Sequence, residues 1–171
     1  MNKIICLIAC LFAMSANANL LTNGDFSTGD LSGWDLSGGE YSQVESGFFR
    51  EYDNSGWAIL SQDIFTVSGQ TYDISFDTFA SQVAGNDFAW AIDGVLTTIS
   101  ATVSWATNID TFIGTGASTN IAFYMATDPG TGTWRFDNAS VTAADVPEPG
   151  TLALLGLGLA GLGYSRKKIN S

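Results

Sequence analysis

The stretch Thr71-Tyr72-Asp73-Ile74-Ser75-Phe76-Asp77 decides the fold class of this chain. Its apolar and polar residues alternate, and a β-strand points successive side chains to opposite faces of a sheet. The three apolar residues Tyr72, Ile74 and Phe76 therefore share one face, and the polar residues share the other. This pattern predicts a strand with one buried and one solvated face.

The same period of two recurs along the chain, and no amphipathic helical stretch of any length appears. It is seen in Phe88, Trp90 and Ile92, in Ile121, Phe123 and Met125, and in Trp134, Phe136 and Asn138. Asp93-Gly94, placed before Val95–Ile99, is a strong hairpin signal. Eight or nine short strands separated by turn residues predict an all-β, antiparallel β-sandwich of the jelly-roll type. We expect one such domain over residues 19–142.

Residues 1–18 have the composition of a secretory signal peptide. Lys3 gives a positive start, residues 4–14 form an apolar run, and Ala16-Asn17-Ala18 fits a cleavage site. Both cysteines lie inside this segment, so the mature chain has no thiol and no disulfide. The alternatives are an uncleaved membrane anchor and lipidation at Cys10, and the apolar run is short for either.

The exported region between Asn19 and Pro149 is strongly acidic. It carries two basic residues, Arg50 and Arg135, and all seventeen acidic residues, a net charge of −15. This charge repels nucleic acid and anionic lipid, and it suits divalent cations or simply solubility. The chain has no histidine, so serine–histidine, cysteine–histidine and zinc sites are excluded. The glutamates show no spacing typical of a glycosidase, so we expect a protein that is not an enzyme.

The C-terminal segment predicts a short transmembrane helix over residues 150–165, preceded by a linker over 143–149. Residues 150–164 are uncharged and would span about 22 Å as a helix, against a hydrocarbon core of about 30 Å. The tail 166–171 begins with three basic residues, which are retained on the cytoplasmic side of a membrane. They are Arg166, Lys167 and Lys168. The domain between the two ends would then lie outside the inner membrane.

Pro147-Glu148-Pro149, the Leu/Gly/Ala run and the basic tail together resemble the PEP-CTERM sorting signal of Gram-negative bacteria. The resemblance implies that an exosortase, an inner-membrane protease, recognises Pro147, Glu148 and Pro149 and removes the tail during export. The protein would be anchored in the membrane transiently and then reach the cell surface or extracellular matrix, in bacteria that make exopolysaccharide. The alternative is an ordinary single-pass anchor.

Three stretches resemble galactose-binding-like and carbohydrate-binding jelly rolls. Residues 19–34 are similar to their opening, residues 60–64 with 69–76 to their central strand pair, and residues 135–141 to their closing strand. The resemblance implies a structural calcium, for which Asp137 matches the closing-strand acid and Asp25 is a second candidate ligand. Two other ligand positions hold Ser27 and Asn138 instead of acids. The alternative is that the aspartates only hydrogen-bond turn backbone.

Modules of this kind stack aromatic rings on sugar faces, so each tryptophan is a candidate. We expect Trp34, Trp90 and Trp134 in the core. The candidate ligand-binding residues are Trp57, Trp105, Phe49, Arg50 and Tyr52.

For these rings the alternative is core packing, and for Arg50 it is an ion pair with Glu51 or Asp53. Two functions follow for the exported protein: a structural surface or matrix protein, or a carbohydrate-binding module that recognises exopolysaccharide.

Overall fold

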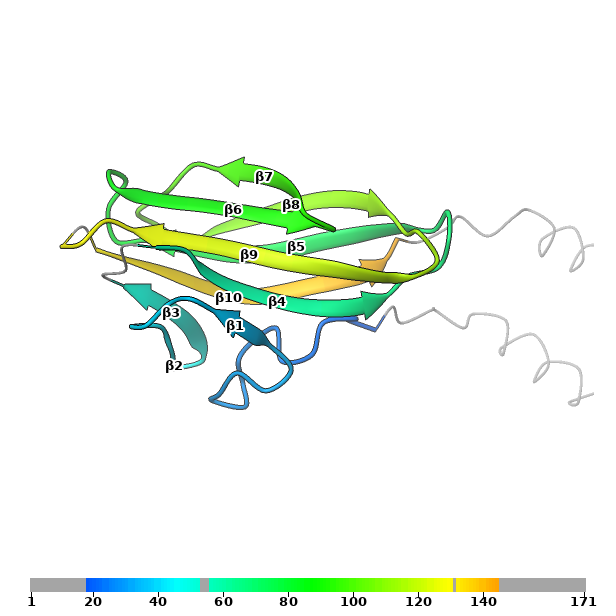
Figure 1. Cartoon of the computed structure of the whole chain (residues 1–171), viewed down its shortest axis with the longest axis horizontal. Coiled ribbons are helices and arrows are strands. Elements are labelled where there is room, and N and C mark those ends of the chain that lie inside the picture. The colour runs from blue at the N-terminus through cyan, green and yellow to red at the C-terminus, as the bar shows by residue number, and fades with distance from the viewer. Residues whose placement is uncertain (1–17, 53–55, 131, 145–171) are drawn as a thin grey trace, which may run out of the picture.

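The protein folds as two antiparallel sheets packed face to face (Figure 1). The computed structural model describes residues 18–52, 56–130 and 132–144. One sheet has the strand order β1-β4-β9-β6-β7 and the other the order β2-β3-β10-β5-β8. The predicted all-β antiparallel sandwich is confirmed. The predicted signal peptide up to residue 17, the PEP motif, the apolar tail and the basic tip lie outside the described residues, in which no helix could span a membrane.

Ten strands build the two sheets, against the eight or nine expected. They are β1 (Asp35–Ser37), β2 (Gln43–Glu45), β3 (Phe48–Tyr52), β4 (Ala58–Phe65), β5 (Thr71–Ala80), β6 (Asn86–Ile92), β7 (Val95–Ile99), β8 (Ala106–Ile113), β9 (Ser118–Thr127) and β10 (Thr133–Ala143).

The alternation in β5 is as predicted, because Tyr72, Ile74 and Phe76 are all buried. The hairpin between β6 and β7 is confirmed too. Asp93 has a φ of 48° and Gly94 a φ of 80°, and both positive angles are what a two-residue turn of this type requires.

One expectation about strand pairing is wrong. The strands β4 and β5 do not form a central pair, because they belong to different sheets. β4 pairs with β1 and β9, whereas β5 pairs with β10 and β8.

Aromatic rings join the two sheets across the core. Phe136 on β10 lies 4.5 Å from Phe123 on β9, measured between ring centroids, and Trp134 lies 5.2 Å from Phe88 on β6. The N-terminal segment adds Phe26, which contacts Phe136 at 6.0 Å. The remaining predicted core tryptophans are buried in the same cluster: Trp34 and Trp90.

The alternation in β10 changes phase at Asn138, which corrects its predicted place beside Trp134 and Phe136. The register shifts between Asp137 and Ser140, so β10 holds one residue more than β5. Asn138 occupies this bulge with a φ of 52° and is exposed, and Ala139 and Val141 then face the core.

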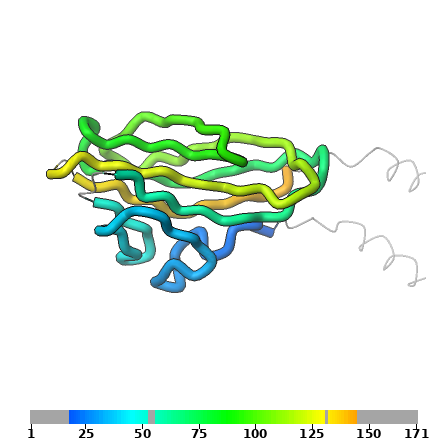
Figure 2. Tube along the Cα trace, in the orientation of Figure 1, coloured from blue at the N-terminus to red at the C-terminus, as the bar shows by residue number. Residues whose placement is uncertain are grey.

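Both ends of the described chain meet at one end of the sandwich (Figure 2). The N–H of Leu20 donates to the carbonyl of Val141 at 2.8 Å, and Asn19 Oδ1 accepts from the N–H of Val141 at 2.9 Å. The segment near residue 20 is thus tied to the last strand, and the chain enters and leaves the domain side by side.

The bulge predicts a specific mutational result. Replacing Asn138 with Ala should destabilise the domain by about 1 kcal/mol relative to replacement with Gly, because a Cβ is strained at positive φ. Both variants lose the Asn138 amide, so urea denaturation of the pair isolates the backbone effect. Equal stabilities would show that the bulge does not depend on this backbone conformation.

Candidate functional site

The outer face of the β2-β3-β10-β5-β8 sheet gathers aromatic and basic side chains. On β3, Phe49 and Glu51 are buried, so Phe48, Arg50 and Tyr52 face outward. On β10 the burial of Trp134 and Phe136 likewise places Arg135 on the outer face. Arg135 lies directly opposite Arg50 on one side and Phe79 on the other.

Two rings, Phe48 and Phe79, contact the Arg135 guanidinium, and a third, Trp105, contacts both of them. We name this group the arginine–aromatic platform: Phe48, Phe79, Trp105 and Arg135. The guanidinium carbon lies 4.9 Å from the centre of the Phe79 ring and 5.2 Å from that of Phe48. The ring of Trp105 lies 5.9 Å from Phe79 and 6.1 Å from Phe48. Because Trp105 is 46% exposed, the platform offers ring surface to a ligand.

Arg50 extends the platform along β3. Its guanidinium lies 5.0 Å from the centre of the Tyr52 ring, and the Tyr52 ring contacts exposed Tyr41 at 6.1 Å. Its Nη1 donates to Glu45 Oε2 at 2.8 Å, and this hydrogen bond lowers the pKa of the Glu45 carboxyl.

The ion pair of Arg50 therefore crosses the β2–β3 hairpin, and the expected pairing with Glu51 is wrong. Glu51 is buried and accepts a hydrogen bond from Thr127 Oγ1 at 3.1 Å. The other expected partner, Asp53, lies outside the described residues.

Two aspartates lie side by side on the same sheet face, since Asp137 is directly opposite Asp77. Asp77 accepts hydrogen bonds from Thr107 Oγ1 at 2.6 Å and from Asn138 Nδ2 at 2.9 Å. Burial raises the pKa of Asp137, and the negative charges of Asp77 and Asp25 raise it further. The backbone N–H of Asn138 donates to Asp137 Oδ1 at 2.7 Å, and this hydrogen bond opposes the rise in the pKa of Asp137.

The structure divides the predicted ligand-binding residues among three places. Trp105, Arg50 and Tyr52 lie on the platform face. Phe49 is fully buried 6.2 Å from Phe26, so its ring offers no surface to a ligand. Trp57 precedes β4 in the other sheet and packs edge-on against Tyr124 of β9.

Phe48, Phe79 and Arg135 were not predicted as site residues. Phe79 is an aromatic residue at a polar position of the β5 alternation, and Arg135 is a cation between two core aromatics. Both exceptions to the alternation can be read in the sequence and could have indicated these two residues as site candidates.

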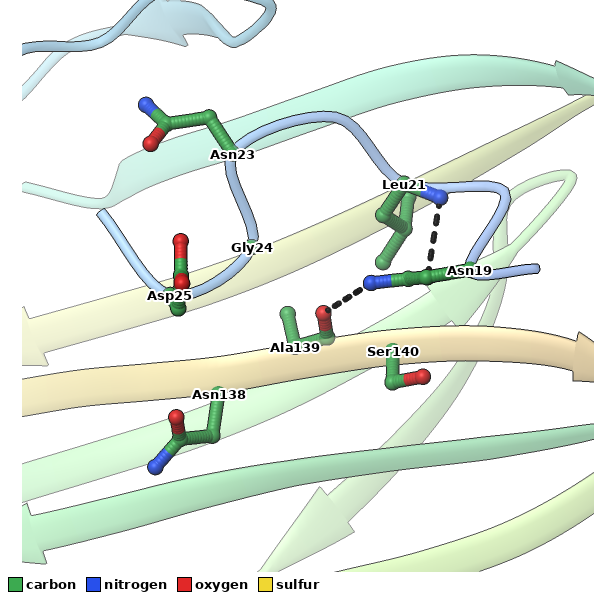
Figure 3. Close-up of a pocket in the computed structure, with 8 residues that line it drawn as sticks. All are labelled: Asn19, Leu21, Asn23, Gly24, Asp25, Asn138, Ala139 and Ser140. Carbon is green, nitrogen blue, oxygen red and sulfur yellow. Dashed lines mark hydrogen bonds between the residues drawn. The ribbon is translucent and has the colours of Figure 1, made fainter. Parts of the chain in front are cut away.

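A shallow pocket of about 320 Å³ lies between the N-terminal loop and the bulge of β10 (Figure 3). It is lined by Asn19, Leu21, Asn23, Gly24, Asp25, Asn138, Ala139 and Ser140. Here the loop approaches the strand closely, because a Cβ on Gly24 would overlap the carbonyl oxygen of Ala139.

This pocket does not assemble the expected calcium ligands. Asp25 lines it, but Asp137 does not, and Asp25 Oδ1 already accepts the N–H of Ser27 at 3.2 Å. Within residues 18–144, excluding the gaps, no three acidic side chains could hold a metal ion together. The pairing of Asp25 with Asp137 as calcium ligands stays a prediction.

Because the pKa of Asp137 is raised, we predict that Asp137→Asn increases the folding stability in a pH-dependent way. The folded state holds the proton more tightly than the unfolded state, whose pKa is near the ordinary 3.8. Stability is therefore lost as the pH rises from the pKa of the unfolded state to the higher pKa of the folded state, and the loss is complete above both values. The amide of Asn does not titrate, so the variant avoids this loss, and its oxygen can still accept the Asn138 N–H.

Urea denaturation should accordingly find the Asn variant more stable than wild type at pH 7, and the advantage should vanish below pH 3.8. A less stable variant at pH 7, in buffer freed of calcium, would contradict this. If added calcium stabilises the wild type but not the variant, Asp137 is a ligand as predicted.

Comparison with known proteins adds two findings. The family description "PEP-CTERM protein-sorting motif" matches residues 145–167. A search of curated proteins finds no match to the chain.

Solved structures match the β-sandwich. A family 61 carbohydrate-binding module in complex with β-1,4-galactotriose is 18% identical, with a TM-score of 0.57 over 74% of this chain and 99% of the module. A family 4 module is 20% identical, with a TM-score of 0.54 over 72% and 99%. The xylan-binding CBM22-1 domain of Paenibacillus barcinonensis Xyn10C is 13% identical, with a TM-score of 0.54 over 77% and 98%.

At such identities the likeness concerns the fold alone. The chain thus combines a PEP-CTERM sorting motif with a β-sandwich domain that matches carbohydrate-binding modules in structure.

Proposed function

We propose that this protein is a non-enzymatic, exported surface or matrix protein whose β-sandwich binds a carbohydrate chain on the arginine–aromatic platform. The observation that carries the proposal is the exposed Trp105 ring beside Phe79 and Phe48, on the outer face of a sheet. Rings of this kind offer apolar area to the C–H face of a sugar. Several of the fold neighbours are themselves carbohydrate-binding modules, which supports a binding role.

Polar groups beside the rings suit sugar hydroxyls. Asp77, Thr107 and Asp137 lie on the same face, and their oxygens accept or exchange hydrogen bonds. A ring platform with a few polar groups at its edge is the usual composition of a site that orients a small polar ligand.

The position of the platform supports a role for a sorted protein. Arg135 lies near the start of β10, and Ala143 at its end lies where the chain leaves the domain. Ala143 lies eight positions after Arg135, roughly 27 Å along the strand at 3.4 Å per residue. A chain held at its C-terminal end would present the platform away from the anchor.

The sorting motif implies processing by an exosortase and an exported, membrane-sorted protein. We propose the finer steps as follows. Residues 1–18 direct export and are removed, residues 150–165 hold the chain in the inner membrane, and processing at Pro147, Glu148 and Pro149 removes the tail. The product then reaches the cell surface or matrix. The competing function is a purely structural matrix protein without a glycan ligand.

The two exposed tryptophans give a matched test of glycan binding. Trp105 and Trp57 are 46% and 44% exposed, and each directly precedes a strand of a different sheet, β8 and β4 respectively. Trp105→Ala should weaken binding to the exopolysaccharide of the source bacterium at least tenfold, about 1.4 kcal/mol, because ring area is lost from the platform. Trp57→Ala should bind as wild type does. Affinity electrophoresis measures both. If the wild-type chain does not bind this polysaccharide at millimolar sugar, the glycan-binding function is wrong and the purely structural function remains.

Replacing Pro147-Glu148-Pro149 by three alanines tests the sorting steps. We expect a longer, membrane-retained form, because the processing protease loses its recognition motif, whereas Asp145→Ala in the same linker should be processed normally. Mass spectrometry of cell-surface and membrane fractions reports both chain ends. If the triple variant is processed as wild type is, the sorting function is wrong and the tail is an ordinary membrane anchor.

A further inference from the structure

The exported region places its only two cations next to each other. Arg50 and Arg135 are directly opposite on the adjacent strands β3 and β10. Like charges directly opposite destabilise a sheet. The same region holds seventeen acidic residues, so either arginine could have been paired elsewhere. Stability alone therefore does not explain why the two cations are together.

Only one of the two guanidinium groups forms an ion pair with the other described residues. Arg50 donates to Glu45 at 2.8 Å. The Glu45 carboxylate also acts on Arg135 through its charge, but Arg135 forms no ion pair or side-chain hydrogen bond with the described residues, and the rings of Phe48 and Phe79 lie against it. Such ring contacts orient a guanidinium without removing its charge. Arg135 is thus oriented and charged, and both rings that contact it also contact the exposed Trp105 ring.

We propose that the platform selects acidic glycans, with the carboxylate of a uronic acid bound to Arg135 while the sugar ring stacks on Trp105. This inference rests on the proposed glycan-binding function and deepens it. The planar fork of arginine matches a carboxylate with two parallel hydrogen bonds. Trp105 lies within 6 Å of Phe79, whose ring touches the guanidinium, so one sugar residue can reach both groups.

The neighbouring aspartates limit how many carboxylates the ligand carries. Asp137 lies two residues beyond Arg135 on the same face, roughly 7 Å along the strand, and Asp77 is directly opposite it. These carboxylates repel a second acidic sugar but accept hydrogen bonds from hydroxyl groups. The ligand class is therefore a glycan in which uronic acids are separated by neutral sugars.

The net charge of −15 does not prevent this contact. At physiological ionic strength, charges farther than about 8 Å from the bound carboxylate are largely screened. The nearer groups decide the interaction. Glu45 is already paired with Arg50, and Asp137, roughly 7 Å along the strand from Arg135, repels the bound carboxylate less than the direct contact with Arg135 attracts it. Distant acids slow the approach of the glycan more than they weaken the bound state.

The test uses the full chain in detergent, with chelator present so that calcium cannot bridge carboxylates. The probes are the exopolysaccharide of the source bacterium and the same polymer after chemical reduction of its carboxyl groups to alcohols. We expect reduction to weaken wild-type binding at least tenfold. Arg135→Gln should weaken binding of the native polymer by the same factor and should remove the difference in affinity between the native and the reduced polymer.

Arg135→Lys tests the geometry of the guanidinium apart from its charge, because lysine keeps the charge without the two parallel donors. This variant should bind the native polymer better than Arg135→Gln does but more weakly than wild type. Equal wild-type binding of both polymers, abolished by Trp105→Ala, would overturn the acidic selectivity and leave glycan binding intact. Binding of neither polymer by wild type would overturn both. The comparison of polymers on wild type needs no variant, so a folding defect in either variant cannot obscure the result.

Discussion

The packing of Trp134 and Phe136 into the core is the constraint on which the rest of the structure depends. Their rings reach across to Phe88 and Phe123 of the facing sheet, so the phase of β10 cannot shift without emptying the core. Arg135 is then forced to the outer face at a strand flanked by β3 and β5. Phe48 and Phe79 lie on either side because those strands are its neighbours, and the platform is a consequence of the core.

The bulge at Asn138 divides β10 into two parts with different tasks. Before it, Arg135 faces outward and belongs to the platform. After it, the reversed phase turns Ala139 inward, and the carbonyl of Gly24 accepts the Ala139 N–H at 2.9 Å. The N-terminal segment can therefore lie along the end of β10, which brings both chain ends to one end of the domain. The platform is left at the other end, away from the point where the described chain leaves the domain.

Local alternation was sufficient to predict the strand at Thr71–Asp77 and the buried Trp90 and Trp134, and the Asp93-Gly94 turn signal predicted the hairpin. The burial of Trp34 was expected from the resemblance to carbohydrate-binding jelly rolls. The stretch Phe48–Tyr52 was not decidable in this way, because aromatic residues occupy both phases and a shift of one residue exchanges the faces. The observed phase buries Glu51, which a preference for apolar interiors argues against. The assembly of the platform also depends on strand order, since Trp105 meets Phe48 only after β8 and β3 join the same sheet through β5 and β10. No short-range pattern carries that information.

Two unfavourable electrostatic arrangements occur on one half of this sheet. Arg50 faces Arg135, and Asp77 faces Asp137. Each costs stability compared with placing opposite charges in these pairs. Where a sequence departs from its own stabilising rules in one place, that place is commonly a functional site. The aromatic core beneath is dense enough to stabilise the sheet despite these arrangements, so the domain keeps a charged, ring-lined surface that its fold alone would not require.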